Sequence, residues 1–252
     1  MKFCILASGS RGNAVWVEES GLALLIDCGL SARECQNRAI AAGLDISKIG
    51  AILVSHEHRD HISGVGPLAR RLNVPVLANR DTWALAGPVA GRVAHQPFTT
   101  GDVLDFGPLK VRTFSISHDT PDPVAFVVES SNGALGLATD LGAPTTLVRH
   151  HLKGLAALIL EFNHDFHMLM EGPYPWPLKQ RVRGRTGHLA NDVAAELAAE
   201  LYHHDLKHLI LAHLSETNNR PELAIEAARQ TLDDALEPVA ASQNHPTIVF
   251  EF

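Results

Sequence analysis

Four side chains of types that bind metal ions lie within six residues of the sequence: His56, His58, Asp60 and His61. They follow a short apolar run, residues 51–54, that predicts a buried strand. In an extended segment, residues two apart point to the same side, so His56 and His58 would face one point while the later pair faces a second. Imidazoles and a carboxylate suit zinc, manganese or iron rather than calcium. The alternative is a polar loop rich in histidine, but the position directly after a buried strand favours a metal site.

Acidic residues and histidines recur where other predicted strands end. These residues are Asp27, His56, His118, Asp140, Glu161 and His213. Taken singly, Asp140 would more often cap a helix, and His213 would more often be a hydrogen-bonded core histidine. Their recurrence at strand ends, where α/β proteins place functional groups, instead predicts a site for two metal ions. Such a site needs roughly seven ligands and a shared bridge about 3.5–4 Å across. The predicted ligands are His56, His58, Asp60, His61, His118, Asp140 and His213.

The elements that must position these residues alternate between short apolar strands and amphipathic helices, which is typical of an α/β fold. Strands are predicted at residues 2–7, 14–18, 22–26, 51–54, 74–77, 93–98, 102–106, 109–116, 124–129, 134–139, 155–160, 209–212 and 247–252. Helices are predicted at residues 31–43, 65–72, 82–86, 145–152, 190–203 and 221–235. The first helix begins with a capping box formed by Ser31 and Glu34. Residues 171–187, which contain three prolines, predict an irregular segment.

Length and composition are those of an ordinary globular protein. The 252 residues are 46% hydrophobic and 19% charged, and no linker-like tract divides residues 1–252, which predicts a single domain. The formal net charge of −7 gives no general basic footprint for nucleic acid, although a local basic patch could still bind it. The three cysteines show no CxxC spacing, which favours the reducing cytoplasm. Neither a signal peptide nor a membrane-spanning run is expected.

Several longer stretches resemble one known family. They are Leu6-Ala7-Ser8-Gly9-Ser10 with Gly12-Asn13, Leu25-Ile26-Asp27-Cys28-Gly29-Leu30-Ser31, Ser117-His118-Asp119 with Asp122-Pro123, Ala138-Thr139-Asp140-Leu141-Gly142, Glu161-Phe162-Asn163-His164-Asp165, Gly187-His188-Leu189 with Asn191, and His213-Leu214-Ser215 with Asn218-Asn219 and Pro221-Glu222. With the H-x-H-x-D-H loop, they resemble the YycJ/WalJ-like branch of the metallo-β-lactamase superfamily over essentially the whole chain. The resemblance implies a four-layered αβ/βα sandwich, in which helices flank two mixed β-sheets. It also implies a metal-dependent phosphodiesterase. Members are described as 5′-to-3′ exonucleases acting on duplex DNA, so DNA is the expected partner.

The resemblance implies a role for each predicted ligand. One metal ion would be bound by His56, His58 and His118, and the second by Asp60, His61 and His213, with Asp140 as the bridge. The ions, zinc or manganese with iron also compatible, would hold a water between them and lower its pKa, so that a bridging hydroxide attacks phosphorus. As a ligand of one of these ions, Asp60 is also counted among the catalytic residues. Asp27 could orient a ligand histidine through its second ring nitrogen, or could be a turn residue before a glycine.

The leaving oxygen needs a proton, and two histidines are candidates to supply it. His188 is the first choice, because related phosphodiesterases supply a histidine from a comparable late loop. The alternative is that His188 only begins a helix and has no chemical role. His164 is the second choice. Glu161 is expected to support His164 or a metal ligand through a hydrogen bond.

Basic residues could form a local phosphate-binding strip despite the negative total charge. The candidates are Arg11, Arg59, Lys179, Arg181, Arg183 and Arg185. Arg11 and Arg59 stand where the branch usually has small polar residues, and Phe162 stands where it has a serine. Both arginines would lie near the mouth of the site. The alternative is that the basic residues are solvated loop charges. Tyr174 and Trp176 could stack on a base, although such residues more often cover a core.

Two further functions remain open from the sequence. The same metal loop would suit a small-molecule hydrolase, such as a cyclic phosphodiesterase or a glyoxalase-II-like thioesterase. A non-catalytic regulatory protein that keeps the metals for stability is the other alternative. The complete ligand set and the additional His188 favour a nuclease.

Overall fold

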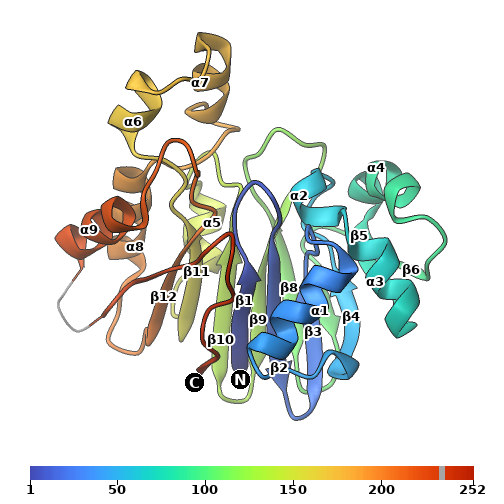
Figure 1. The fold of residues 1–252 in the computed structure, drawn as a ribbon. Coiled ribbons are helices and arrows are strands. Elements are labelled where there is room, and N and C mark those ends of the chain that lie inside the picture. Colours follow the sequence, from blue (N-terminus) through green and yellow to red (C-terminus); the bar gives the residue numbers. More distant parts are fainter. Residues whose placement is uncertain (233–235) are drawn as a thin grey trace.

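Two mixed β-sheets of seven strands each pack face to face in the part of the chain that the computed structural model describes, residues 1–232 and 236–252 (Figure 1). The strands of the first sheet, in the order in which they pair, are β14 (Phe250–Glu251), β1 (Lys2–Ala7), β2 (Ala14–Glu19), β3 (Leu22–Ile26), β4 (Ile49–Leu53), β5 (Val76–Asn79) and β6 (His95–Phe98). Those of the second sheet are β13 (Val239–Ala240), β12 (His208–Ala212), β11 (Ala157–Glu161), β10 (Gly133–Ala138), β9 (Val124–Ser130), β8 (Lys110–Ser115) and β7 (Val103–Asp105).

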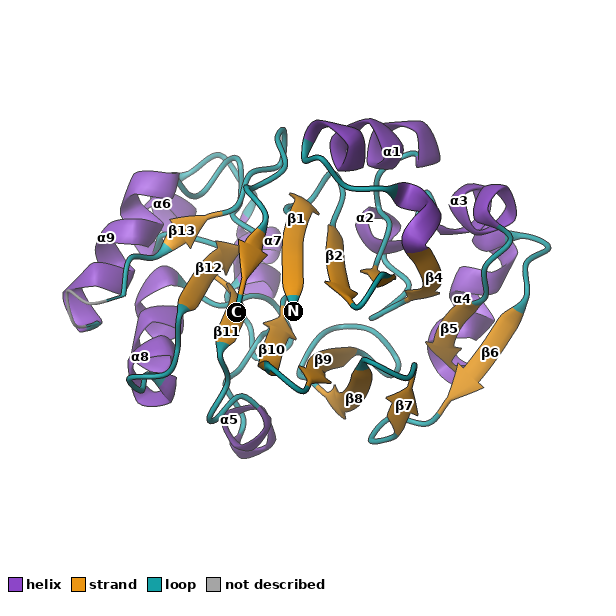
Figure 2. Cartoon of the chain, turned by 90° about the horizontal axis from the view of Figure 1, so that it is seen from below, coloured by secondary structure: helices purple, strands orange, loops and turns teal. Residues whose placement is uncertain are grey.

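Helices cover the outer face of each sheet, which gives the four layers that the resemblance implied (Figure 2). The helical segments over the first sheet are α1 (Ala32–Ala41), the 3₁₀ turn Ile46–Lys48, α2 (Arg59–Ile62), α3 (Val65–Leu72) and α4 (Arg80–Ala90). Those over the second are α5 (Thr146–His151), α8 (Asn191–Leu201) and α9 (Pro221–Thr231). Two short helices, α6 (Phe166–Glu171) and α7 (Trp176–Val182), project beyond the strand ends (Figure 1).

Both faces of each sheet are buried, because side chains alternate along every strand. In β1, Phe3 and Ile5 belong to the core between the two sheets, whereas Cys4 and Leu6 belong to the core beneath the helices of the first sheet. A third core lies between the second sheet and α5, α8 and α9. The three cysteines are buried free thiols. In the described residues, no helix is long and apolar enough to cross a membrane.

Strand direction explains why the candidate site residues meet at one edge. The pairs β3–β4, β10–β11 and β11–β12 are parallel, so these strands end at the same side of their sheets. Strand β8 pairs antiparallel with β9, which pairs antiparallel with β10, so β8 also runs in the same direction as β10. The residues after these strands therefore gather at one edge of the sandwich.

The sequence-based boundaries need correction around the site. Residues 171–187 are not irregular as predicted, because α7 lies within them and α6 precedes it. The prolines begin α7 rather than break it: Pro175 is its N-cap and Pro177 lies in its first turn, where no backbone N–H is needed. The last strand is shorter than predicted. The helix predicted at 221–235 ends at Thr231, and residues 233–235 lie outside the described part.

Candidate metal centre

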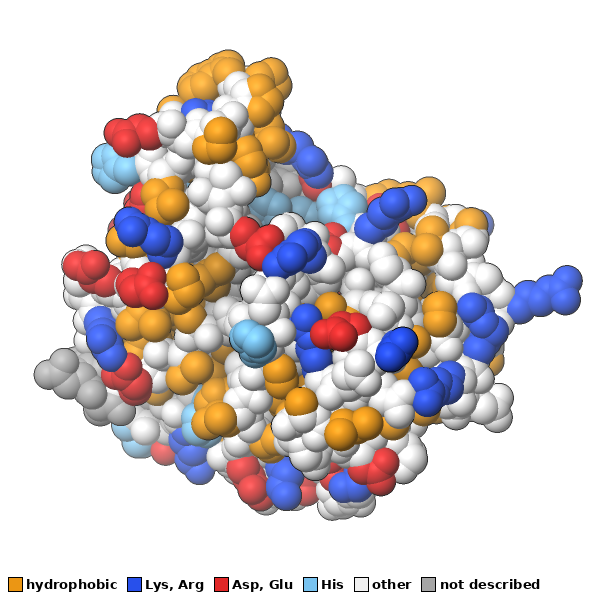
Figure 3. Space-filling view, in the orientation of Figure 1, with side chains coloured by type: hydrophobic (Ala, Val, Ile, Leu, Met, Phe, Trp, Pro, Cys, Tyr) orange, Lys and Arg blue, Asp and Glu red, His pale blue; other side chains and the backbone are white. Residues whose placement is uncertain are grey.

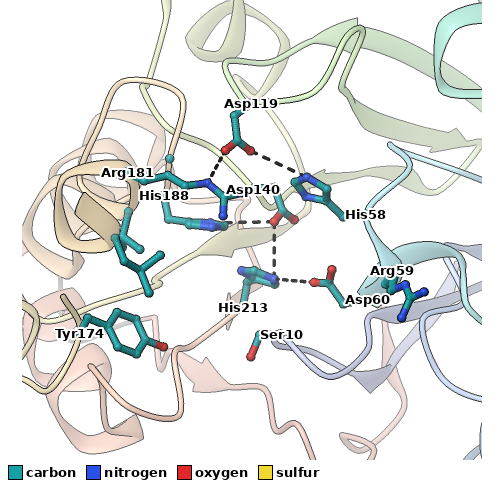
Figure 4. Close-up of a pocket in the computed structure, with 13 residues that line it drawn as sticks. Ser10, His58, Arg59, Asp60, Asp119, Asp140, Tyr174, Arg181, His188 and His213 are labelled. Carbon is teal, nitrogen blue, oxygen red and sulfur yellow. Dashed lines mark hydrogen bonds and ion pairs between the residues drawn. The ribbon is translucent and has the colours of Figure 1, made fainter. Parts of the chain in front are cut away.

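All seven predicted ligands come together where the two sheets end, and Figure 4 shows four of them, His58, Asp60, Asp140 and His213. They form two groups, in each of which the possible ligand atoms lie within 4.8 Å of one another. The first group contains His56, His58 and His118, and the second contains Asp60, His61, Asp140 and His213. The segment between β4 and the end of α2 supplies four of these side chains, and the segments after β8, β10 and β12 supply one each.

The Asp140 carboxylate belongs to the second group but also faces the first. Its Oδ1 atom is 3.8 Å from Nε2 of His118 in the first group and 3.5 Å from Nε2 of His213 in the second. Its Oδ2 atom is 3.2 Å from Nε2 of His61. A carboxylate in this position could contact ions in both groups, which is the geometry that a bridging ligand needs.

Close backbone packing fixes the loop that carries Asp60 and His61. The Asn13 N–H donates to the Asp60 carbonyl at 2.7 Å, and the Cys28 N–H donates to the His61 carbonyl at 2.8 Å. A Cβ atom on Gly29 would lie 1.6 Å from the Asp60 carbonyl oxygen, so only glycine allows this approach. The turns that follow β1 and β3 therefore hold the metal loop in place.

The Asp27 carboxylate fixes the orientation of His61. Its Oδ2 atom lies 2.8 Å from His61 Nδ1 and also accepts from the Ser55 hydroxyl at 2.7 Å. Its Oδ1 atom accepts from the Ser55 N–H at 2.8 Å. When Nδ1 donates to Asp27, the other ring nitrogen is free to bind a metal. Asp27 therefore contacts the second ring nitrogen of a candidate ligand, as its expected orienting role requires, and Ser55, which the sequence did not single out, contacts both.

Glu161 performs a similar task at the second sheet. It is fully buried, and its Oε1 atom lies 3.1 Å from His213 Nδ1 and 2.8 Å from His188 Nδ1. Its Oε2 atom accepts from the N–H groups of Leu141 and Leu189. Burial alone would raise the pKa of the Glu161 carboxyl, but the two histidines lower it to about 2. A fixed negative charge therefore lies behind both rings.

One buried ring nitrogen provides a direct test of whether a metal fits. His56 Nδ1 lies 3.0 Å from the Ser55 hydroxyl, while His56 Nε2 is buried and has no hydrogen-bond partner. Leaving such an atom unpaired is costly, and a metal ion would satisfy it. His118 follows the same pattern, because its Nδ1 lies 3.3 Å from the Gly187 carbonyl and its Nε2 faces the first group. The donor set therefore fits divalent metal ions.

Charge differs between the two groups. Burial lowers the pKa of His56 well below its ordinary value, so that the ring is neutral. Burial would also lower the pKa of His61 and His213, but the Asp140 carboxylate and other nearby acids raise both pKa values well above the ordinary range. The second group thus gathers several negative carboxylate charges. A bound cation would stabilise these charges.

Backbone strain is concentrated at the same place. Asp27, Asp140 and His213 follow β3, β10 and β12, and have φ angles of +59°, +58° and +55°. Residues other than glycine rarely adopt this left-handed conformation, and such strained residues are found repeatedly at active sites as well as in turns. The strain turns each side chain from its strand end toward the shared edge.

A cavity of about 350 Å³ opens over the ligands. Besides candidate ligands, its lining includes Ser10, Arg59, Asp119, Tyr174, Arg181 and His188 (Figure 4). His164, the second candidate proton donor, is buried and does not line this cavity. Burial lowers the pKa of His164 to about 4, so this ring is neutral near pH 7 and lacks the imidazolium form that acts as a general acid.

The predicted basic strip is not continuous. Residues two apart share a side only in an extended chain, and α7 is helical, so its basic residues point in different directions. Lys179 is buried and donates to the Met170 carbonyl at 2.6 Å, which removes it from the expected phosphate contacts. Arg183 lies over the Trp176 ring, and Arg185 is exposed outside the cavity lining.

Two arginines of the predicted strip do reach the cavity, and a third does not. Arg59 and Arg181 are lining residues, whereas Arg11 is exposed and paired with Glu216. Asp119 holds Arg181 through a 2.6 Å contact between Oδ2 and Nε. The sequence assigned Asp119 no role, although its position directly after His118 was a signal that it could act near the metals.

Comparisons with known proteins agree with this geometry. Residues 23–214 match the family described as the Beta-lactamase superfamily domain. The chain is 39% identical over 237 residues to Exodeoxyribonuclease YycJ of Bacillus anthracis, covering 93% of this chain and 90% of that protein. It is 35% identical over 229 residues to Exodeoxyribonuclease WalJ of Streptococcus pneumoniae, covering 88% and 85%.

A solved structure gives the same result for the fold. The metallo-beta-lactamase fold protein YhfI from Bacillus subtilis matches with a TM-score of 0.76 at 16% identity, and the match covers 99% of both chains. The predicted four-layered sandwich is therefore confirmed, and its edge carries a His/Asp cluster typical of metal-dependent hydrolases of this fold. This chain belongs to the metallo-β-lactamase superfamily, in its YycJ/WalJ-like branch.

Proposed function

We propose that this chain is a dinuclear-metal-dependent phosphodiesterase that acts as a 5′-to-3′ exonuclease on duplex DNA. The observation that carries the proposal is the convergence of seven candidate ligands, with Asp140 facing both groups, on a cavity that His188 also lines. Two relatives that carry the name exodeoxyribonuclease align with most of the chain, which supports DNA as the substrate.

The metal site would be divided as the two groups suggest. His56, His58 and His118 would hold one divalent ion, Asp60, His61 and His213 the other, and Asp140 both. Zinc or manganese, and also iron, suit such ligands. Ions bound there would supply Lewis acidity, lowering the pKa of a water and offsetting the charge that develops on the phosphate oxygens.

His188 would provide the proton that the leaving group needs. As a water oxygen bonds to phosphorus, the bond from phosphorus to the leaving oxygen breaks, and that oxygen takes up a proton. Burial acts to lower the pKa of His188, but its contact with Glu161 outweighs burial and raises the pKa above the ordinary value. The contact with Glu161 therefore favours the protonated form of this ring, which lies on the cavity wall.

Arg59 and Arg181 would bind the phosphates of the strand. Asp119 contacts Nε of Arg181, which leaves the terminal nitrogens of the guanidinium directed along the cavity (Figure 4). Guanidinium groups bind phosphate through paired hydrogen bonds, so an arginine fixed in this way would orient the strand as well as attract it.

Cleavage of a linear duplex carrying a 5′ label tests the proposal. Metal-stripped protein is reloaded with manganese or with zinc and compared with the Asp60→Ala/His61→Ala double variant. We expect label release that depends on metal and is lost in the double variant. If wild-type protein with confirmed bound metal releases no label, the exonuclease assignment fails, and cyclic phosphodiesters and thioesters become the substrates to examine.

A further inference from the structure

We propose that the α6–α7 projection, residues 166–182, is a stacking platform for an unpaired base, so that the DNA strand enters the metal centre from an opened or single-stranded end. This inference rests on the proposed function, because it assumes that DNA is the substrate. It goes further by stating which form of the DNA end is bound and which side chain binds it.

The projection is continuous with the candidate active site. It stands beyond the ends of β11 and β12 (Figure 1). Tyr174, Leu178 and Arg181, all within it, line the same cavity as Asp140 and His188 (Figure 4). A strand whose terminal phosphate lies at the metals would therefore extend past these residues.

An aromatic ring is exposed on α7, the helix that also supplies Leu178 and Arg181 to the cavity, although Trp176 itself does not line the cavity. Trp176 keeps 51% of its surface exposed, and the Arg183 guanidinium lies 5.4 Å above its ring centroid. Apolar side chains gather at the outer tip of the projection (Figure 3). An exposed aromatic ring with an arginine beside it is the combination that binds single-stranded nucleic acid without sequence preference, because every base has a π-face.

The platform is held rigidly. Lys179 is buried and bonds to the Met170 carbonyl, which ties α7 to the end of α6. The Asp165 side chain caps α6 by accepting from the Met168 N–H at 2.8 Å. A rigid aromatic surface loses little conformational entropy when a base stacks on it.

Charge favours a polyanion over an acidic or neutral partner. Between residues 166 and 188 there is one acidic side chain, Glu171, and the exposed basic side chains are Arg181, Arg183 and Arg185, since Lys179 is buried. The chain as a whole has a net charge of −7. A basic, aromatic segment on an otherwise acidic protein is complementary to the phosphates and bases of a nucleic-acid strand.

Size explains why the strand should be unpaired. The cavity of about 350 Å³ is near the lower end of small-ligand pockets, a size that suits the end of one strand better than a duplex. Opening a terminal base pair costs about as much stacking energy as one base regains on an aromatic side chain. Trp176 could therefore offset the cost of separating the first pair.

Binding of an uncleavable single strand tests the platform. The probe is a fluorescently labelled oligothymidylate with phosphorothioate linkages, measured by anisotropy with metal-loaded protein. Loss of one stacking contact corresponds to roughly a 5- to 150-fold weaker affinity, which we expect for both Trp176→Ala and Trp176→Leu. The leucine variant keeps an apolar side chain, so equal weakening in both variants identifies stacking rather than general apolar contact.

Phe166→Ala is the matched control. Phe166 is a similarly exposed aromatic residue of the projection, 45% exposed, but it borders a different hollow that also contains Asp192 and Glu226. These carboxylates repel phosphate, so we expect this variant to bind the oligonucleotide as the wild type does. Thermal unfolding of each variant confirms that the substitutions, all at exposed positions, leave the fold intact.

Intrinsic fluorescence provides a second readout. Of the three tryptophans, Trp16 is fully buried and Trp83 is stacked on His95 with ring centroids 4.0 Å apart, so Trp176 is the one available to a base. We expect the unlabelled oligonucleotide to quench wild-type fluorescence and to leave the Trp176→Leu variant unaffected.

The outcomes separate this inference from the proposed function. Unchanged affinity and quenching in the Trp176 variants would overturn the platform, even if the protein cleaves DNA. Weaker binding in the Trp176 variants, from a protein that cleaves no DNA, would support the platform and contradict the exonuclease assignment.

Discussion

His61 Nδ1 lies 2.8 Å from the Asp27 Oδ2 atom, and both side chains are almost completely buried. The pair joins the end of β3 to α2, and so links the scaffold of the first sheet to a candidate metal ligand. The carboxylate fixes which nitrogen of the ring faces the cluster, and partners of this kind commonly set metal affinity.

Replacing this carboxylate should weaken metal binding. In Asp27→Asn, the ring loses its negative partner, and we expect metal affinity to fall about 10- to 100-fold in competition with a chelator. Asp105→Asn, at an exposed carboxylate far from the cluster, should bind metal normally. Unchanged affinity in Asp27→Asn would mean that Asp27 only shapes the turn after β3.

Removing the candidate proton donor should slow turnover without removing metal. For His188→Asn, we expect the cleavage rate to fall by about 10²- to 10⁴-fold, the usual contribution of general acid catalysis. Metal content, measured by elemental analysis, should remain that of the wild type. His167→Asn on exposed α6 is the control for loss of a histidine. If the His188 variant loses metal, the ring supports the cluster instead.

A methyl group at Gly29 should disturb the metal loop. The Cβ of Gly29→Ala would lie 1.6 Å from the Asp60 carbonyl, so the backbone must shift. We expect the free energy of unfolding, measured with urea, to fall by about 1–3 kcal/mol, as for other overpacked sites. Gly50→Ala is the comparison, because there the new Cβ meets the flexible end of the Leu22 side chain. Equal stability of the two variants would contradict the prediction.

Neutralising Arg181 should change the salt dependence of DNA binding. In Arg181→Gln, one phosphate contact is lost, so the negative slope of log affinity against log salt should become less steep by about 1. Arg92→Gln removes the same charge from an exposed position bordering a separate hollow near β6, and it should leave the slope unchanged. A wild-type slope in the Arg181 variant would show that phosphate is bound elsewhere.

Buried His164 should make stability depend on pH. Its folded pKa of about 4 is below the ordinary value of 6.5, so the unfolded chain binds a proton more readily. Stability should therefore fall as pH decreases from about 6.5 to about 4, with His164 contributing roughly 3 kcal/mol to the loss. In His164→Gln, unfolding free energies measured across this range should decrease by less than in the wild type. Parallel pH profiles would show that His164 titrates normally.

The amino-acid sequence by itself determined which residues could form the centre. Short apolar runs fix strands through local hydrophobic patterning, and several of the site residues lie just after one of them, as Asp140 follows β10 and His213 follows β12. The helix beginning after Ser31 was also predictable, because the hydroxyl accepts from the Glu34 N–H within the same turn. Motifs and patterns of this kind are local in the chain, so a sequence reveals them.

Only the tertiary structure decided how those residues are used. The contacts of Asp27 with His61 and of Glu161 with His188 join residues 34 and 27 positions apart, and no local pattern specifies them. The tertiary structure also decided the role of the segment around Lys179. The alternating basic pattern of this segment had suggested an exposed strip. In the structure, part of this segment is a helix, and Lys179 is buried against the Met170 carbonyl at the end of α6, a contact that the alternating pattern does not specify.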